Sequence, residues 1–300
     1  MNAILFIGHG TKKREGNEQL LQFVESMKGD IPYPIVETCF LEFSTPTIRE
    51  GIKRCVDQGA TKVGLVPMMF FSAGHAKIHI PVEIDEAKAM YPLVEFNYGR
   101  PIGVHDKVFD ILQSRLHDVG FSNEKGKEEV GILLVGRGSS DADANSELYK
   151  IGRLLSEKLE MVNVELSFIG VTSPTVEEGV ARSIKLGVKN IYIIPYFFFT
   201  GILMDRMAEK LQTFQVKYSQ LHFSMTEFFG FHPILKTIFI ERAQEALQGE
   251  AKLNCDVCSY RLHAMEHMDI HHHHDHDHHD HHDQHHGHTH HHNHQHEIQR

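Results

Sequence analysis

The feature that most constrains the fold is an internal repeat at an offset of 128 residues. Gly8-His9-Gly10 aligns with Gly136-Arg137-Gly138, and three further blocks align at the same offset. These blocks are 44–51 with 172–179, 59–63 with 187–191, and 66–72 with 194–200. Four blocks in one register rarely arise by chance, so the sequence predicts a duplicated unit of roughly 120 residues.

Each repeat alternates short apolar runs with longer amphipathic stretches. Strands are expected at 3–8, 35–41, 63–70, 93–98, 130–135, 163–170, 189–196 and 221–227. Helices are expected in the first repeat at 15–28, 47–58, 82–90 and 105–118, with Pro46 and Pro174 in the first turns of helices. The prediction is an α/β fold of two duplicated, doubly wound parallel-sheet domains with a cleft between them. Ligands of such sheets bind beyond the carboxyl ends of the strands.

Composition divides the chain into four predicted segments. Residues 1–121 and 130–248 are the two domains, joined by a polar stretch, and residues 249–270 carry a Cys-x-x-Cys pair. Residues 271–300 form a histidine-rich tail, because seventeen of the 26 histidines lie there among Asp, Gln and Asn. Nothing in that tail can build a core, so it is expected to be disordered.

The overall charge and the apolar runs exclude several classes of protein. A formal net charge of −10 argues against nucleic acid as the main partner, because phosphate binding needs a basic face. No run resembles a signal peptide or a bilayer span, and four cysteines are too few for a small secreted framework. A cytoplasmic protein without a membrane partner is expected.

The duplication separates residues needed for folding from candidates for chemistry. A folding residue should recur in both repeats, whereas His9 becomes Arg137, Glu42 becomes Gly170, and His75 has no counterpart in a stretch one residue shorter. All three follow predicted strand ends. Two imidazoles and a carboxylate there suit a divalent metal such as Co²⁺, Fe²⁺ or Zn²⁺, or the abstraction of protons. The alternative is that each residue merely caps a helix.

Three motifs carry a resemblance to a known family. They are the run from Ile7 to Thr11, Phe40-Leu41-Glu42, and the run from Pro67 to His75. Together they resemble the class II chelatases, above all the long CbiX form of the sirohydrochlorin cobaltochelatases, which are related to the siroheme ferrochelatases.

The resemblance implies an enzyme that inserts Co²⁺ into the tetrapyrrole sirohydrochlorin, with release of two protons, in cobalamin biosynthesis. It also implies that His9 and His75 bind the metal and take part in catalysis, assisted by Glu42. His79 lies one helical turn beyond His75, but Pro81 suits the start of the next helix, so residues 75–80 are expected to be a loop.

Basic residues near the predicted site are candidates for binding the acidic ring. Arg137 could hold a ring carboxylate in bidentate fashion, or it could form an internal salt bridge. Lys13 and Arg14 could bind the same substrate, although a solvated loop explains each of them alone.

The Cys255–Cys258 pair can chelate a metal, form a redox disulfide or join an iron–sulfur cluster. The resemblance implies a [4Fe–4S] cluster, which would need further ligands, such as those of a second subunit in a homodimer. Cys39 and Cys55 are expected to be buried packing residues.

The tail allows two readings, an inert segment or a metal store. Its histidines are interrupted by carboxylates, which is untypical of a purification tag and suits Co²⁺, Ni²⁺, Cu²⁺ or Zn²⁺.

Three alternative functions follow: a sirohydrochlorin ferrochelatase, a metal-storage protein or metallochaperone, and a phosphate-transferring enzyme using Gly8-His9-Gly10. The last is disfavoured because the histidine phosphatases have Arg where Gly8 stands.

Overall fold

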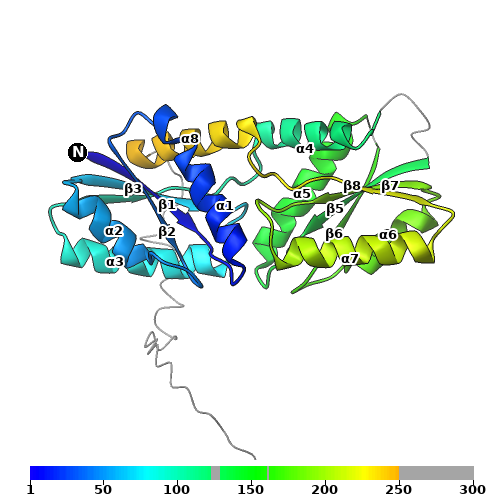
Figure 1. Ribbon diagram of the computed structural model, residues 1–300, viewed down its shortest axis with the longest axis horizontal. Helices are drawn as coiled ribbons and strands as arrows, with labels where there is room; N and C mark the ends of the chain where they lie inside the picture. The colour runs from blue at the N-terminus through cyan, green and yellow to red at the C-terminus, as the bar shows by residue number, and fades with distance from the viewer. Residues whose placement is uncertain (123–128, 161, 250–300) are drawn as a thin grey trace, which may run out of the picture.

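The protein contains two four-stranded parallel sheets, one for each sequence repeat (Figure 1). The computed structural model describes residues 1–122, 129–160 and 162–249. The strand orders are β2-β1-β3-β4 and β6-β5-β7-β8, so the two sheets have the same topology. This confirms the predicted duplicated α/β fold.

The first repeat supplies four strands and four α-helices. Its elements are β1 (Asn2–Gly8), α1 (Arg14–Glu25), η1 (Lys28–Asp30), β2 (Ile35–Phe40), α2 (Ile48–Asp57), β3 (Lys62–Met68), η2 (His75–His79), α3 (Ile80–Met90), β4 (Glu95–Tyr98) and α4 (Asp106–Asp118). Those of the second are β5 (Val130–Gly136), α5 (Ala142–Lys158), β6 (Asn163–Phe168), α6 (Val176–Lys185), β7 (Asn190–Pro195), α7 (Ile202–Lys217), β8 (His222–Met225) and α8 (Pro233–Gln248).

The central strands are buried on both faces because helices cover both sides of each sheet. In β1, Ile4 and Phe6 point into one core, and Leu5 and Ile7 point into another. The first of these cores continues without interruption into the second repeat, where it includes Leu134 of β5. The two halves are therefore joined by one hydrophobic core and share more than a surface contact.

Helices α2 and α6 begin with the same capping box. The side chains of Thr47 and Thr175 accept the N–H of Glu50 and Glu178, whose carboxylates in turn accept the threonine N–H. Both prolines therefore precede the N-cap, so the prediction that Pro46 and Pro174 lie in the first helical turn was wrong by two residues. At the N-cap, the threonine side chain accepts a backbone N–H of the first helical turn, and a proline has no side-chain oxygen that could do so.

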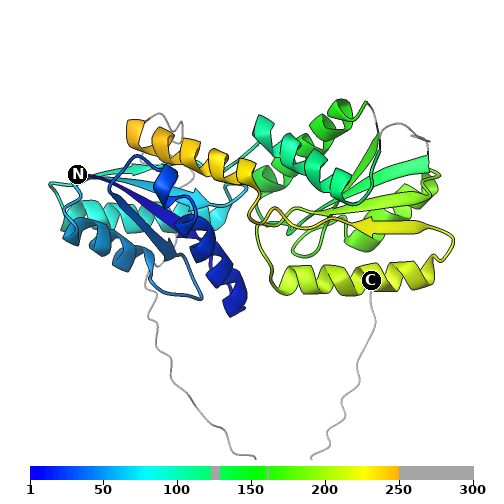
Figure 2. The same ribbon diagram turned by 45° about the horizontal axis from the view of Figure 1, so that its top comes forward.

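The last helix of each repeat packs on the sheet of the other repeat (Figures 1 and 2). From α8, the ring of Phe239 makes an edge contact with Phe6 of β1, at 6.4 Å between centroids. From α4, the ring of Phe109 lies under Lys158 of α5, with Nζ 5.1 Å from its centroid. The predicted limits 1–121 and 130–248 follow the sequence repeats. In the folded protein, α8 of the second repeat packs on the first sheet and α4 of the first repeat packs on the second sheet.

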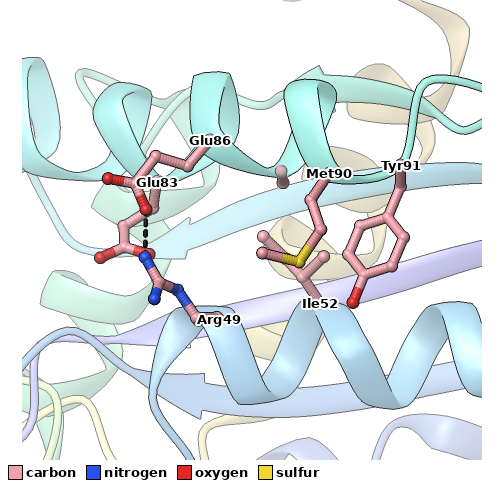
Figure 3. Close-up of a pocket in the computed structure, with 7 residues that line it drawn as sticks. Arg49, Ile52, Glu83, Glu86, Met90 and Tyr91 are labelled. Carbon is pink, nitrogen blue, oxygen red and sulfur yellow. Dashed lines mark hydrogen bonds and ion pairs between the residues drawn. The ribbon is translucent and has the colours of Figure 1, made fainter.

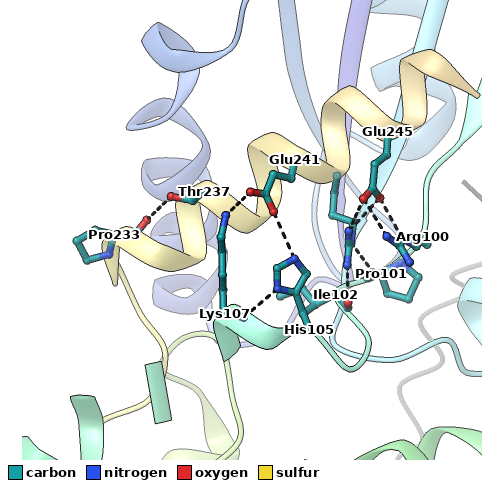
Figure 4. A network of polar contacts seen from close by, with 10 residues as sticks. Arg100, Pro101, Ile102, His105, Lys107, Pro233, Thr237, Glu241 and Glu245 are labelled. Carbon is teal, nitrogen blue, oxygen red and sulfur yellow. Dashed lines mark hydrogen bonds and ion pairs between the residues drawn. The ribbon is translucent and has the colours of Figure 1, made fainter. Parts of the chain in front are cut away.

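A polar network fastens α8 to the first half (Figure 4). The buried guanidinium of Arg242 donates to the carbonyl oxygens of Pro101 and Ile102, at 3.0 and 2.8 Å. The Glu245 carboxylate accepts from both Arg242 and Arg100, with shortest distances of 2.8 Å. Because the Arg100 hydrogen bonds favour the ionised form, the pKa of Glu245 is lowered. Burial lowers the pKa of Arg242, but a guanidinium remains charged at neutral pH.

The carboxyl edges of the two sheets face each other where the halves meet. Phe70, after β3, and Phe198, after β7, occupy equivalent repeat positions, and their rings stack at 3.8 Å with an interplanar angle of 2°. Stacking between equivalent residues means that a local two-fold axis runs through this contact. The predicted ligand-binding edges of both sheets therefore lie at the junction between the repeats.

Candidate functional site

The loop after β1 holds His9 directly against the loop after β2. The N–H of Glu42 donates to the carbonyl of His9 at 3.0 Å, and Leu41 N–H donates to the carbonyl of Gly8 at 2.9 Å. Gly10 has a φ of 86°, and a Cβ atom there would lie 1.7 Å from the carbonyl oxygen of Glu42. Only glycine permits this close approach, so the Gly-x-Gly pattern serves to bring the two loops together.

The second repeat has the same backbone arrangement with different side chains. Gly170 N–H donates to the carbonyl of Arg137 at 3.1 Å, and Gly138 repeats the φ of 86°. The scaffold therefore recurs, while His9 and Glu42 are replaced by Arg137 and Gly170. The two loops therefore keep one backbone arrangement although these two side chains differ between the repeats.

Three of the predicted site residues meet at the junction. Nδ1 of His9 is 3.2 Å from Oε1 of Glu42 and 3.3 Å from the carbonyl of Gly10, and Nε2 is 3.3 Å from Nη1 of Arg137. The His9 and Glu42 side chains are 26% and 31% exposed, so solvent and a ligand can reach them.

The partners of His9 assign its hydrogen. A carboxylate and a carbonyl can only accept at Nδ1, whereas a guanidinium can only donate to Nε2. His9 therefore carries its hydrogen on Nδ1 and presents the Nε2 lone pair toward Arg137. A histidine whose Nδ1–H is held by a carboxylate is the usual arrangement of a metal-binding imidazole.

His75 begins the π-helical turn η2, which leads into α3. Residues 75–80 were expected to form a loop, and this expectation was wrong, because the π turn ends at His79 and α3 begins at Ile80. The first repeat is one residue longer here than the second, and a π turn accommodates one extra residue within a helix. The structure places the His75 backbone after β3, at the same sheet edge as His9 and Glu42, but its side chain is outside the described part. His79 ends the π turn.

Two salt bridges join the repeats on either side of the local axis. Lys13 Nζ lies 2.8 Å from Asp205 Oδ2, and Lys77 Nζ lies 2.7 Å from Asp141 Oδ2. Burial of Lys77 disfavours its charge, but the hydrogen bonds to Asp141 and Asp143 outweigh this and raise its pKa. Positions 13 and 141 are equivalent, as are 77 and 205, so the first repeat supplies both lysines and the second both aspartates. The sequence contains this charge reversal, but each of these residues alone resembles a solvated charge.

The other two predicted ring-binding residues are engaged within the protein. Lys13 belongs to the salt bridge with Asp205, and the hydrogen bond to that carboxylate raises its pKa. Arg14 is 91% exposed and its Nε lies 2.6 Å from Oε1 of Glu18, one turn along α1. Of the three basic candidates, only Arg137 touches His9.

Two of the four cysteines lie within the described residues. Cys39 and Cys55 are buried in the core of the first half, as expected, and burial raises the pKa of Cys55 to about 12. Cys255, Cys258 and the histidine-rich tail lie outside the described residues. Within the described ranges, no group of three or more His, Cys, Asp or Glu side chains is arranged to hold a metal. In the same ranges, no helix is long and apolar enough to cross a bilayer.

A shallow recess lies between α2 and α3 (Figure 3). An Arg49–Glu86 ion pair crosses it, and Ile52, Met90 and Tyr91 line it further along. Glu83 also lines the recess, and burial raises its pKa. The recess includes none of His9, Glu42 and Arg137, so we do not assign it to the same site.

Comparisons with known proteins agree on one family. The CbiX family matches twice, over residues 3–119 and 131–246. A sirohydrochlorin cobaltochelatase of Priestia megaterium is 51% identical over 272 residues, covering 90% of this chain and 88% of that protein. A sirohydrochlorin ferrochelatase of the same organism is 36% identical over 250 residues, covering 83% and 92%.

Solved structures agree with this result. SirB from Bacillus subtilis with Fe³⁺ has a TM-score of 0.74 and 33% identity, covering 83% of this chain and 96% of that one. SirB from Bacillus subtilis subspecies spizizenii in complex with cobalt has a TM-score of 0.71 and 30% identity, covering 82% and 95%.

Proposed function

The chain belongs to the CbiX family and is a metal chelatase, and from this premise we propose that it inserts Co²⁺ into sirohydrochlorin in the synthesis of cobalamin. The observation that carries the proposal is the one-sided pair His9–Glu42, built on a loop scaffold that both repeats share. In the reaction, the ring exchanges two pyrrole N–H protons for one divalent ion. The site must therefore both present a metal and accept protons.

We propose that His9 presents the ion through Nε2, and that the ion takes the place of the Arg137 N–H that this nitrogen accepts at 3.3 Å. Glu42 holds the Nδ1–H at 3.2 Å, which fixes the imidazole orientation and increases its basicity as a ligand. His75 follows β3 at the same sheet edge and is proposed as the second histidine ligand. An imidazole pair with one carboxylate suits Co²⁺, Fe²⁺ and Zn²⁺ alike.

Proton acceptance falls to the carboxylate of Glu42 in this proposal. Pyrrole protons leave as the ion enters the ring, and an ionised carboxylate beside the metal ligand can accept one directly or through water. The Glu42 side chain is partly exposed, so it can release the first proton to solvent and then accept the second.

Arg137 is proposed to bind a carboxylate of the ring. Its guanidinium donates one N–H to His9 Nε2, at 3.3 Å, until the ion takes that lone pair, and two of its other N–H groups match a carboxylate in bidentate geometry. Lys13 and Arg14 have a weaker case, because Asp205 and Glu18 already pair with them.

Iron is the second candidate metal, and a specific observation favours considering it. The 36% identical relative is a sirohydrochlorin ferrochelatase, and the SirB structures contain Fe³⁺ in one case and cobalt in the other. We propose cobalt because the 51% identical relative is a cobaltochelatase and because the histidine-rich tail suits storage or delivery of Co²⁺.

A [4Fe–4S] cluster at Cys255 and Cys258 also remains a proposal. Cys39 and Cys55 cannot complete it, because both are buried in the core of the first half. Because only two of the four cysteines then remain, four thiolate ligands would require two copies of the chain. We propose a cytoplasmic location and no nucleic-acid or membrane partner, in keeping with the acidic composition.

The test is anaerobic insertion of Co²⁺ and of Fe²⁺ into sirohydrochlorin, followed by visible absorbance beside reactions without enzyme. The proposal predicts acceleration with both metals and a higher kcat/KM with Co²⁺. A higher kcat/KM with Fe²⁺ would assign the ferrochelatase. No acceleration with either metal, despite tight metal binding, would favour the metal-storage protein.

A further inference from the structure

Two exposed apolar side chains stand at equivalent positions beside the candidate site. Phe43 follows Glu42 directly and is 55% exposed, and Val171 follows Gly170 and is 66% exposed. The positions are 128 residues apart, so the duplication has kept a large apolar residue at both. An apolar side chain left in water on both sides of the axis gains nothing from the hydrophobic effect in the protein alone.

Both residues also have an unfavourable backbone conformation. Phe43 has a φ of 60° and Val171 a φ of 64°, whereas the left-handed region favours Gly, Asn and Asp and is particularly unsuitable for β-branched Val. Strained residues that persist in exposed loops concentrate at sites that bind or react. Asn or Gly would relieve the strain, so folding alone does not account for an apolar residue at both positions.

The loops carrying these residues are tied to the central pair. Backbone hydrogen bonds join Glu42 to His9 and Gly170 to Arg137, and the side chains of His9 and Arg137 meet at 3.3 Å. The positions of Phe43 and Val171 therefore flank that pair, one from each repeat.

We propose that Phe43 and Val171 form two apolar contacts for the flat face of the tetrapyrrole, one from each side of the His9–Arg137 pair. This inference rests on the proposed function, because it identifies how that substrate is held. A tetrapyrrole combines a broad apolar face with carboxylates at its rim. Phe43 and Val171 match the face, and Arg137 matches the rim.

Lys12 adds a second reason to choose an acidic ring as the occupant. Its Nζ lies 5.5 Å from the centroid of the Phe43 ring, which places a cation beside this apolar contact. An apolar face bordered by carboxylates would meet both groups at once. A second copy of the chain would have to offer the same combination, and its binding is a distinct outcome of the test.

The experiment measures binding of metal-free sirohydrochlorin to the full chain, by the change in ring absorbance under anaerobic conditions without metal. Phe43→Asn and Val171→Asn keep a residue that tolerates the left-handed conformation while they remove the apolar surface. Each is expected to raise Kd by about tenfold, which corresponds to the free energy of burying one apolar side chain. Phe43→Leu keeps the apolar contact and is expected to stay within about threefold of the wild type.

Melting temperature separates this role from a structural one. Both Asn variants should melt within about 2 °C of the wild type or above it, because they relieve strain. Leu93→Asn is the matched control, since Leu93 is exposed in the turn before β4, and it should change neither quantity.

The proposal is overturned if both Asn variants bind the ring as the wild type does. It is equally overturned if the ring affinity of the variants falls only when their melting temperature falls too. It is also overturned if the variants change the molecular mass in solution, which reports self-association, and leave the ring affinity unchanged. A wild type that neither binds sirohydrochlorin nor inserts metal refutes the proposed function, whereas an active enzyme with unaffected Asn variants refutes this inference alone.

Discussion

Nε2 of His9 lies 3.3 Å from Nη1 of Arg137, although the two residues occupy the same position in their repeats. The local two-fold axis therefore passes between an imidazole and a guanidinium. A symmetric pair of imidazoles would offer a metal two identical ligands, whereas this pair offers one ligand and one fixed cation. Under the proposed function, duplication has allowed one position to bind the metal and its copy to bind an acidic substrate.

Arg137 is expected to contribute mainly to ring binding. Arg137→Ala removes a charge-assisted contact, so KM for sirohydrochlorin should rise by about 10- to 100-fold. kcat should change by less than about threefold, because the metal ligands remain. The KM of Arg137→Lys should lie between those of the wild type and Arg137→Ala, since a lysine keeps the charge but cannot bind a carboxylate in bidentate fashion. Steady-state kinetics with saturating Co²⁺ make the measurement, and an unchanged KM in both variants would refute the assignment.

Glu42 is expected to act on the chemical step. Glu42→Gln can still accept the Nδ1–H of His9 but cannot take up a proton, so kcat should fall by about 10²-fold or more while ring affinity is retained. Glu37→Gln is the control, because Glu37 accepts a hydrogen bond from Gln58 and does not contact His9. Single-turnover absorbance measures the step. Equal rates for Glu42→Gln and the wild type would show that Glu42 is not the base.

The Lys77–Asp141 salt bridge is expected to stabilise the junction between the halves. Both side chains are largely buried, at 25% and 17% exposure, and they are 2.7 Å apart. A double-mutant cycle with Lys77→Ala and Asp141→Ala should give a coupling free energy of about 1 kcal/mol in urea unfolding. The Lys53–Asp57 pair on α2 is fully on the surface and should give a smaller coupling. Equal couplings would mean that burial at the junction adds nothing.

The docking of α8 is expected to weaken in acid. The Arg100 hydrogen bonds lower the folded-state pKa of Glu245, so its contribution is complete above the unfolded value of about 4.3 and is lost as pH falls through the folded value. The difference in unfolding free energy between wild type and Glu245→Gln should therefore stay constant from pH 7 to about pH 5 and shrink below about pH 4. A difference that is constant down to pH 3.5 would contradict the lowered pKa.

Truncation after residue 270 tests the sequence-based role of the histidine-rich tail. Turnover at saturating Co²⁺ should be unchanged, because His9 and Glu42 remain. The Co²⁺ concentration needed for half-maximal rate should rise, because a tethered store raises the local concentration of the ion. Replacing the tail with a Gly/Ser segment of equal length controls for chain length. An unchanged metal dependence would reduce the tail to a spacer.

Much of the fold could be predicted from local patterns. Apolar runs located the ends of the eight strands to within two residues, because strands buried on both faces leave a continuous apolar run. The exchange of α4 and α8 could not be predicted, because amphipathicity shows that a helix is covered but not by which sheet. The caps before Ile48 and Val176 were missed because each proline was placed in the first helical turn, whereas the N-cap is the threonine that directly follows it.

Site residues could be predicted where a single residue differs between the repeats. They could not be predicted where two charged residues are exchanged together. Comparing the repeats singled out His9, Glu42 and Arg137, which the structure brings together. The Lys13–Asp205 and Lys77–Asp141 pairs escaped notice because each residue alone resembles a solvated charge. The reversal of charge between equivalent positions was the available signal. It becomes meaningful only once the two sheet edges are known to face each other.

The central claim is that the repeat carrying His9 is the one that inserts the metal. Its most direct test is a single-turnover experiment in which sirohydrochlorin is bound to the full chain and Co²⁺ is then added anaerobically, with wild type and His9→Ala compared. We predict rapid formation of cobalt-sirohydrochlorin by the wild type. His9→Ala should bind the ring with unchanged affinity and show only the rate seen without enzyme. Insertion by His9→Ala at the wild-type rate would contradict the account.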